Sequence, residues 1–325
     1  MNFKTKFAAI CLGLACSFSA MAQSGAYPNR PIKLIVGFPP GQATDVIARM
    51  AARKLQEALG QPVVVENKPG ASGIIGSELV SKATPDGYTL VVGSSGTMAI
   101  NPSLYSKLPY HPLKDFEPVA LLSTVPLFLA VNPSFPAQTA ADLVRMAKAE
   151  PGKITYGSAG SGVTSHLTME LFKHTQGIDM THIPYKGSPA AVTDLMSGQI
   201  NAMIDTGPAL LPHMRSGKVR VLAVASNKRN AAAPDVPTIA EAGLGNFETP
   251  AWIGLAAPKG TPKEVVDTLN KVFVKNWQDA PDVKAQLNNL GAEPSVLSPQ
   301  DFSRFIQSEI DKWALAVRVS GAKVD

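Results

Sequence analysis

Residues that could hold an anion gather in two loops of similar design. Each loop follows a strand-like apolar run and precedes an amphipathic run of helical period, and the two copies span residues 32–50 and 153–171. The exposed amides at the start of a helix carry partial positive charge, so they can hold a carboxylate or phosphate without a basic side chain. Two such loops that face each other predict a site that closes on one small anion.

The first loop, residues 38–45, reads FPPGQATD. Phe38 and the two prolines after it provide an apolar wall and a rigid approach, which a plain connector does not need. Thr44 or Asp45 is placed to cap the helix that begins there. We interpret this loop as one half of the anion site, and an ordinary strand-to-helix turn is the alternative.

The second loop, residues 157–166, reads GSAGSGVTSH and contains no lysine or arginine. Compared with the phosphate-binding pattern GxxxxGK[ST], it matches at the glycines and the threonine, but Val163 occupies the lysine position. This difference argues against a nucleotide phosphate. A flexible turn is the alternative, and the histidine can equally be a structural residue near a helix start. The candidate ligand contacts in this loop are Ser158, Gly162, Thr164, Ser165 and His166.

Further candidates stand at the ends of other predicted strands. Ser94 and Thr97 follow the third strand and should lie at the same carboxyl edge as the first loop, where open α/β sheets bind ligands. Asp205 ends a strand in the second half of the chain. It could meet a ligand amine or hydrogen bond the backbone, and both interpretations stay open.

The sequence lacks the common residue patterns of catalytic sites. The chain has no GxSxG elbow, its five histidines show neither HExxH nor a spacing of four residues, and residues 70–76 lack the GxGxxG of dinucleotide binding. We therefore expect a protein that is not an enzyme and that uses no metal and no cofactor. The enzymatic alternative is an exported serine hydrolase that uses Ser158 or Ser161 with His166.

The elements that must position these loops alternate between strand and helix. Continuous Val, Ile and Leu runs separated by helices predict parallel sheets covered on both faces, as in doubly wound α/β domains. The expected helices cover residues 44–59, 72–82, 140–149, 165–174, 189–196, 208–215, 262–277, 281–290 and 299–317.

The alternation breaks at residues 118–133, which hold two apolar strands joined at Pro126 without a helix. Because proline excludes a regular central strand there, we interpret this run as a crossing between domains. A strand near residue 251 returns the chain. The sequence thus predicts two doubly wound α/β domains joined by a two-crossing hinge, with domain 1 formed by residues 27–123 and 253–325 and domain 2 by residues 124–252.

The N-terminus has the pattern of an export signal. Two lysines precede an apolar run and a small-x-small site, so we expect a signal peptide over residues 1–22 that is cleaved after Ala22. The two cysteines of the chain, Cys11 and Cys16, fall in this segment. Lipidation of Cys16 is an alternative, although Gly13 stands where a lipobox has a large aliphatic residue.

Composition limits the partners. Removal of Lys4 and Lys6 with the signal peptide lowers the formal charge from +5 to +3, which is small for a chain of 325 residues. Nucleic acid is therefore not an expected partner. Roughly 300 mature residues exceed one comfortable core, in agreement with two domains.

Seven short segments spread over the mature chain form a specific combination: GFPPGxxxD, PVVVENKPGASG, PDGYTL, YGSAGSG, PYKG, DVPTIAEAG and GLAAPKGTP. Together they resemble the Bug (TctC-like) solute receptors of tripartite tricarboxylate transporters. The resemblance implies a periplasmic binding protein of the type II-like fold, monomeric, that closes on a small organic acid in an interdomain cleft. It also implies delivery of that acid to the membrane permease subunits of the transporter.

The ligand class implied by the resemblance is broad, and dicarboxylates, tricarboxylates, amino acids and aromatic acids all remain open. A solute sensor that docks on a signalling receptor is a further alternative. One departure concerns Gln42, which stands where the family commonly has a glycine, so its side-chain amide can supplement the backbone contact. The resemblance places ligand contacts at Phe38, Ala43, Thr44, Ser158, Gly162 and Ser165.

Overall fold

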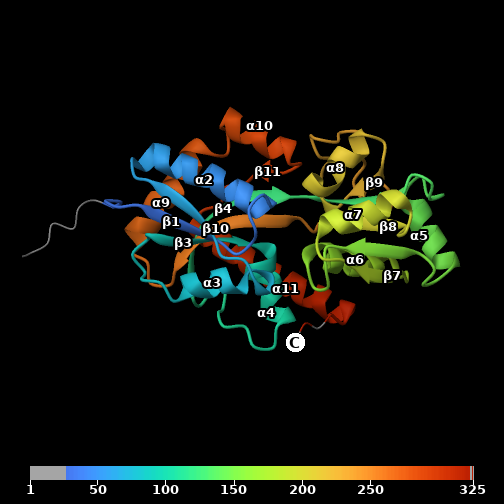
Figure 1. Cartoon of the computed structure of the whole chain (residues 1–325), viewed down its shortest axis with the longest axis horizontal. Helices are drawn as coiled ribbons and strands as arrows, with labels where there is room; N and C mark the ends of the chain where they lie inside the picture. The colour runs from blue at the N-terminus through green and yellow to red at the C-terminus, as the bar shows by residue number, and fades with distance from the viewer. Residues whose placement is uncertain (1–26, 323, 325) are drawn as a thin grey trace, which may run out of the picture.

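The computed structural model describes residues 27–322 and residue 324, so the expected signal peptide and Cys16 lie outside the described residues. In this part of the chain, no helix is both long and apolar enough to cross a membrane. Two mixed sheets lie side by side along the long axis of the molecule, each with helices on both faces (Figure 1). The predicted α/β fold class with two sheets is confirmed, whereas the domain boundaries stay a prediction.

Sheet A has the strand order β11-β4-β10-β3-β1-β2. The first three strands of the chain run parallel to one another, and β10 runs antiparallel to both of its neighbours. The bounds of the strands are β1 (Ile32–Val36), β2 (Val63–Asn67), β3 (Thr89–Ser94), β4 (Phe116–Val125), β10 (Ala251–Pro258) and β11 (Glu293–Pro294).

Alternation along β1 explains how both faces of sheet A are covered. Ile32, Leu34 and Val36 enter one apolar cluster, whereas Ile35 enters another on the opposite face. The first cluster also contains apolar residues of α2 (Ala43–Leu59), α9 (Lys263–Asn276) and α10 (Pro281–Asn289). The second contains those of α3 (Ile74–Ser81), η2 (Gly96–Ile100), α4 (Asn101–Leu104) and α11 (Pro299–Ser320), and the short turn η1 (Ala71–Gly73) precedes α3.

Sheet B has the strand order β7-β6-β8-β5-β9. Its helices α7 (Ser188–Ser197) and α8 (Gly207–Arg215) pack on one face, and α5 (Ala140–Ala149) and α6 (Thr164–Gln176) pack on the other. The bounds of the strands are β5 (Leu127–Val131), β6 (Thr155–Ser158), β7 (Thr181–Pro184), β8 (Ala202–Thr206) and β9 (Arg220–Val224).

The expected parallel sheets are wrong in one respect. β5 runs antiparallel to β8 and β9, and β10 runs antiparallel to β3 and β4. Each of these strands is the first that the chain forms after it passes from the other sheet. Such a strand starts at the edge where the sheets meet and runs away from it, whereas the strands of the βα units end there.

Most expected helices begin and end within about two residues of the observed ones, and the helix predicted for residues 140–149 is found with those bounds. Thr139 caps α5 and Ser298 caps α11 through their side chains. The structure adds η2 and α4 directly after β3, where the sequence pattern indicated only a strand end.

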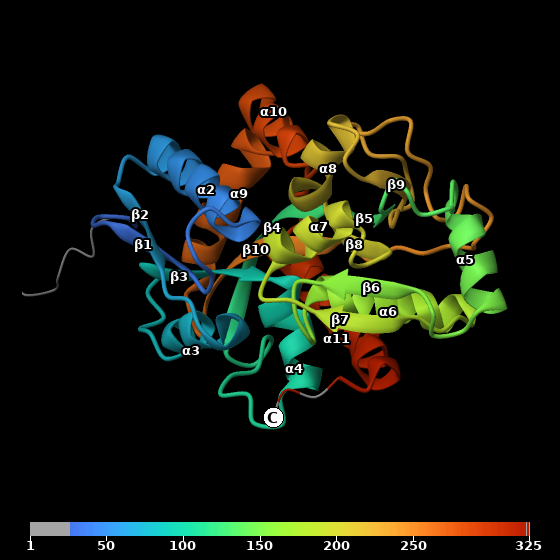
Figure 2. The same cartoon turned by 45° about the vertical axis from the view of Figure 1, so that its right-hand side comes forward.

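The crossing at Pro126 fixes where the two loops lie. Pro126 joins the end of β4 to the start of β5. β1 and β3 run in the same direction as β4, while β6 and β8 run opposite to β5. The carboxyl ends of these four strands therefore lie at the two sheet edges that meet at Pro126. Both predicted loops start from those edges (Figure 2).

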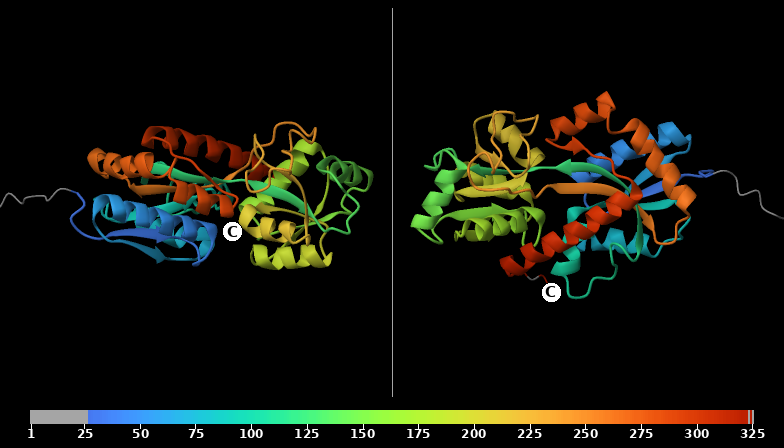
Figure 3. Two further views of the ribbon diagram at one scale, coloured as in Figure 1. Left: turned by 90° about the horizontal axis from the view of Figure 1, so that it is seen from above. Right: turned by 180° about the vertical axis from the view of Figure 1, so that it is seen from behind.

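Helix α11 connects the two halves a second time. It packs against β4 and α4 beside sheet A and against α6 beside sheet B. One apolar cluster accordingly runs through both halves, from Phe302 and Trp313 of α11 to Leu171 and Phe172 of α6. The right-hand view of Figure 3, seen from behind, shows α11 lying obliquely across the sheets and reaching from one half to the other.

Candidate functional site

The first loop is packed against two other segments at the carboxyl edge of sheet A. A Cβ added to Gly73 would lie 2.6 Å from Cγ2 of Thr97 and 3.2 Å from Cζ of Phe38. The side chains of Phe38 and Thr97 therefore meet over this glycine, which has a φ of +84°. The structure thus brings the apolar wall of the first loop next to the turn that follows β3.

The start of α2 differs from the expected capping. The helix begins at Ala43 with Gln42 as the N-cap residue, so Asp45 lies inside the first turn. The Asp45 carboxylate accepts hydrogen bonds from the Gly41 amide at 2.9 Å and from the Arg49 guanidinium at 2.9 and 3.0 Å. Asp45 thus holds the loop that precedes the helix and leaves the first amides of α2 unused.

The protonation of Asp45 follows from these contacts. Burial alone would raise the pKa of this carboxyl, because only 2% of the residue is exposed. The hydrogen bonds from Arg49, Gly41 and Asn67 outweigh burial and hold the pKa below its usual value. Asp45 is therefore a carboxylate whose negative charge is balanced by Arg49.

Ser94 and Thr97 bond mainly to each other. The Ser94 amide donates to Thr97 Oγ1 at 3.0 Å, and the Thr97 amide donates to Ser94 Oγ at 3.4 Å. Both residues are buried. Their hydroxyls stabilise the turn from β3 into η2, and their predicted contact with a ligand stays a prediction.

The second loop is held by its own side chains. The Ala159 amide donates to Ser165 Oγ at 3.1 Å, and the Gly162 amide donates to Nδ1 of His166 at 3.0 Å. Ser158 is fully buried, and its hydroxyl donates to the Gly160 carbonyl at 3.0 Å. These residues were expected to meet a ligand, and the contacts observed for Ser158, Ser165 and His166 shape the loop.

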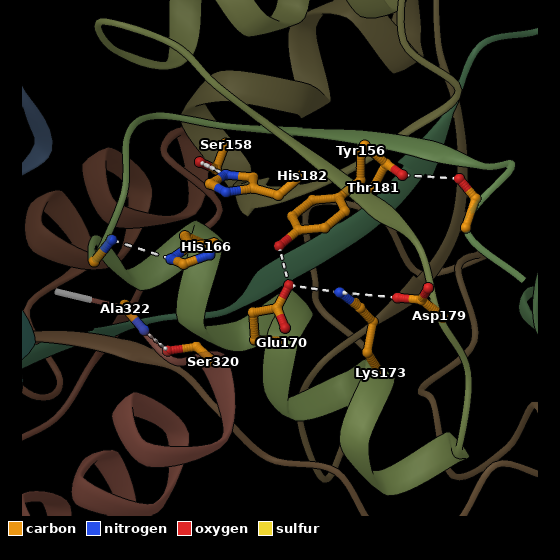
Figure 4. A network of polar contacts seen from close by, with 12 residues as sticks. Tyr156, Ser158, His166, Glu170, Lys173, Asp179, Thr181, His182, Ser320 and Ala322 are labelled. Atoms are coloured by element: carbon orange, nitrogen blue, oxygen red, sulfur yellow. Dashed lines mark hydrogen bonds and ion pairs between the residues drawn. The ribbon is translucent and has the colours of Figure 1, made fainter.

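Two histidines and a tyrosine form a stack beneath this loop (Figure 4). The ring of His182 lies 4.0 Å from that of His166 and 4.8 Å from that of Tyr156, measured between centroids. His182 Nε2 lies 2.7 Å from Ser158 Oγ. The Tyr156 hydroxyl donates to Glu170, whose carboxylate is paired with Lys173 at 2.8 Å.

The surroundings of the stack keep both imidazoles neutral. Burial, together with the smaller effect of the positive charge of Lys173, lowers the pKa of His166 to about 4. Burial and the neighbouring His166 likewise lower the pKa of His182 to about 4. A neutral imidazole has one lone pair, and in His166 that lone pair accepts the Gly162 amide.

The arrangement does not favour the hydrolase alternative. The imidazole next to Ser158 belongs to His182, and Nδ1 of the expected partner, His166, is occupied by Gly162. The Ser158 hydroxyl is also buried. Sequence reasoning missed His182, because only the pairing of β6 with β7 places it opposite Tyr156.

Asp205 lies at the end of β8, one residue before the residue that pairs with Leu127. Its carboxylate accepts the Ser188 hydroxyl and the Thr206 amide, both at 2.7 Å. Burial raises its pKa despite these hydrogen bonds. The structure shows the hydrogen bond of Asp205 to the backbone, which was one of the two interpretations. The other, a contact to a ligand amine, stays a prediction.

The two halves of the molecule touch on both sides of the crossing. Gly162 has a φ of +74°, and a Cβ placed on it would lie 2.5 Å from Cδ2 of Leu104 in α4. Gly207, at the start of α8, approaches the backbone of Leu290 and Gly291 so closely that an added Cβ would lie 2.9 Å from the Leu290 carbonyl oxygen. The second loop therefore lies directly against the half that carries the first loop.

The helices that start at the facing edges share one property. Within residues 27–322, no side chain caps α2, α6, α7 or α8, and α9 and α10 likewise have none. Among the described residues, the amides of Ala43, Thr44 and Thr164 donate no hydrogen bond. The starts of α2 and α6 thus present unused amides at the place where the sheets meet.

Two surface hollows lie elsewhere. One is lined by residues of α4 and the following loop, including Tyr105, Tyr110 and His111. The other lies at the far end of sheet B beside Asn132 and Lys218. Neither is lined by any of the predicted ligand contacts, so neither belongs to the predicted anion site.

Comparisons with known proteins bear on what such an arrangement does. The model of the tripartite tricarboxylate transporter family receptor matches residues 47–321. Protein BugT of Bordetella pertussis is 41% identical over the full length of both chains. A UPF0065 protein from the tcbD-tcbE intergenic region of a Pseudomonas strain is 40% identical over 94% of this chain and 91% of that protein.

Solved structures of similar proteins agree in fold. A Rhodopseudomonas palustris protein with adipate has a TM-score of 0.81 and 39% identity, with 91% of this chain and 99% of that chain covered. MatC from Rhodopseudomonas palustris with bound malate has a TM-score of 0.77 and 35% identity, covering 90% and 100%. The periplasmic binding protein BugD has a TM-score of 0.76 and 36% identity, covering 91% and 99%.

Proposed function

Because this chain belongs to the tripartite tricarboxylate transporter family receptors, we propose that it captures a small carboxylate between its two sheets and delivers it to the membrane permease of such a transporter. The family is one of solute-binding receptors. The observation that carries the proposal is that two uncapped helices, α2 and α6, start from the two sheet edges joined by Pro126.

The strength of such a site can be assessed from the number of hydrogen bonds. Each hydrogen bond to a charged group contributes about 1.5 to 3 kcal/mol. Micromolar affinity corresponds to about 8 kcal/mol, so roughly four to six bonds suffice once the ordering costs are subtracted. The unused amides of Ala43, Thr44 and Thr164, together with ordered water, can supply this number without an arginine.

We propose a dicarboxylate as the first class to test. Adipate and malate are present in the two R. palustris relatives, and both are dicarboxylates. One carboxylate would meet the start of α2 and the other the start of α6. Phe38 would cover the chain between them, and the exposed Gln42 would reach the carboxylate at α2.

Location and partners belong to the same proposal. The predicted signal peptide and relatives described as periplasmic support a periplasmic receptor. That it acts as a monomer is part of the proposal. The two halves would open and close about the crossing at Pro126 and the return before β10, so that the permease meets the closed form.

The experiment is a calorimetric and thermal-shift screen of the mature chain from residue 23 against adipate, malate, citrate, aspartate and benzoate. At least one acid should bind stoichiometrically and raise the melting temperature. Native mass spectrometry of the freshly purified protein would add any co-purified acid to the set. A screen in which no acid binds would contradict the proposal.

A second measurement addresses delivery. Deletion of the gene should abolish uptake of the labelled acid that binds, while transcription induced by that acid should stay unchanged. Normal uptake with lost induction would instead support a sensor.

A further inference from the structure

The stack beneath the second loop includes two histidines to which the proposed function assigns no direct role. His166 is 5% exposed, and its Nδ1 accepts the Gly162 amide at 3.0 Å. His182 lies parallel to it at 4.0 Å and contacts Ser158 at 2.7 Å. The two rings thus hold the second loop at two points, His182 at Ser158 (Figure 4) and His166 at Gly162.

We propose that His166 is a positioning residue for anion capture, which fixes the Gly162 amide through the Nδ1 lone pair and thereby sets the path of the second loop. The role requires the Nδ1-acceptor form of the ring, with the proton on Nε2. His166 acts through Gly162 and not by contact with the anion. The inference rests on the proposed function in one respect: its test by affinity needs an acid that the protein binds.

The position of Gly162 explains why this constraint matters. Its φ of +74° is reached easily only by glycine, and its Cα faces Leu104 of the opposite half. The next residues, Val163 and Thr164, begin α6. A rotation of the Gly162 peptide would therefore redirect the amides at the start of α6 and change the contact between the halves.

The stack keeps the lone pair aimed at its donor. His182 covers one face of the His166 ring, and Tyr156 backs His182 on the other side at a centroid distance of 4.8 Å. The charged groups around the stack in the described chain are Glu170 and Lys173 of α6 and Asp179 before β7, which form one ion-paired cluster. Ser320 and Ala322 at the end of α11, drawn in the same view, carry no charge (Figure 4). Lys173 disfavours a protonated His166, in agreement with the acceptor role.

Two substitutions separate the acceptor from the volume of the ring. In His166→Asn, Oδ1 occupies the position of Nδ1 and can still accept the Gly162 amide. In His166→Leu, a side chain of similar size has no acceptor. His174→Leu, in the exposed last turn of the same helix, is the matched control.

The variants are compared by calorimetry with adipate and malate as probes and by hydrogen exchange of the Gly162 amide. We expect His166→Asn to bind within about threefold of the wild type, whereas His166→Leu binds at least tenfold more weakly at an equal melting temperature. The Gly162 amide should exchange at least tenfold faster in His166→Leu only. The proposal would be overturned if both variants lost affinity for the acid equally. It would also be overturned if His166→Leu kept the affinity and the Gly162 exchange rate of the wild type.

A measurement on the unmodified protein covers the case in which a variant does not fold. Long-range proton–nitrogen correlation should find Nδ1 of His166 unprotonated and Nε2 protonated, and the opposite tautomer would refute the acceptor role. If the wild type binds no acid, the proposed function fails, while the tautomer and the exchange of Gly162 still decide whether His166 holds the loop.

Discussion

The two loops, which start from the sheet edges that meet at the crossing, are supported by different chemistry. The first loop is tied by a carboxylate: Asp45 bonds Gly41 and pairs with Arg49, whose side chain is 52% exposed. The second loop is tied by neutral, stacked imidazoles of His166 and His182. Both supports produce the same result, a helix start with unused amides. Under the proposed function, these would be two ways to build an anion site, one by balancing a charge and the other by avoiding one.

The loops also differ in what lies opposite their glycines. A Cβ on Gly41, which has a φ of +86°, would meet nothing within 4 Å, whereas one on Gly162 would collide with Leu104. Both positions disfavour other residues on conformational grounds. At Gly162 a larger side chain would also collide with the other half of the molecule.

The largest effect is therefore expected from Gly162→Val. Strain at positive φ should lower the free energy of unfolding by about 1 to 2 kcal/mol, and the clash with Leu104 should hold the halves apart. Affinity for the bound acid should fall at least a thousandfold, which is about 4 kcal/mol, as measured by calorimetry. Gly41→Val is the control, with similar destabilisation and an affinity within about tenfold of the wild type. Equal affinities in the two variants would contradict the assigned difference between the loops.

Acid should loosen the second loop before the first. His166 has a pKa lowered to about 4 in the folded protein, against 6.5 in an unfolded chain. The unfolded state therefore binds more protons than the folded state between these values, so the stability from this neutral histidine is complete above about pH 6.5 and is lost as the pH falls towards 4. The loss attributable to His166 should approach roughly 3 kcal/mol. Asp45 becomes protonated only below its ordinary value of 3.8.

Urea unfolding between pH 7 and 4.5 measures this dependence. His166→Asn, which cannot titrate, should show a shallower decline of the unfolding free energy than the wild type. His174→Leu should decline as steeply as the wild type. A wild-type unfolding free energy that stays constant over this range would show that the stack does not exclude protons.

The carboxylate support of the first loop can be tested by Asp45→Asn. The amide can still accept the Gly41 hydrogen bond but no longer balances Arg49, so we expect a loss of about 2 kcal/mol in unfolding free energy. Asp267→Asn removes an exposed pair with Lys263 at the same spacing and should cost less than about 0.5 kcal/mol. Similar losses in both variants, measured by urea unfolding, would mean that the Asp45 network is only surface electrostatics.

Local signals allowed much of this fold to be predicted. Apolar periodicity and capping residues mark single helices, so residues 140–149 could be assigned without tertiary information. Pro126 marked the crossing between sheets. The antiparallel direction of β5 and β10 could not be predicted in this way, because strand pairing depends on residues far apart in the chain.

The site shows the same limit. The two loops were recognisable because glycine, hydroxyls and a following helix are adjacent in sequence. The partners of the loops were not recognisable: His182 contacts Ser158 only because β7 pairs with β6, and Leu104 meets Gly162 only because the two halves pack together. Whether Gln42 contributes to binding could not be decided from its residue type.

The smallest expected effects come from restoring the missing caps. Gln42→Ser and Val163→Thr place a hydroxyl at the N-cap positions of α2 and α6, where it can accept one of the unused amides, and valine and threonine have nearly the same shape. Each substitution should raise the unfolding free energy by about 0.5 to 1 kcal/mol and weaken binding of the acid severalfold, because hydroxyl and carboxylate compete for the same donors. Ala280→Ser, at the uncapped start of α10, should stabilise the protein equally without any change in affinity. If both caps stabilise the fold and leave the affinity for the acid unchanged, then the amides at the starts of α2 and α6 do not hold the anion. If only one cap leaves the affinity unchanged, the loop that carries this cap is not part of the site.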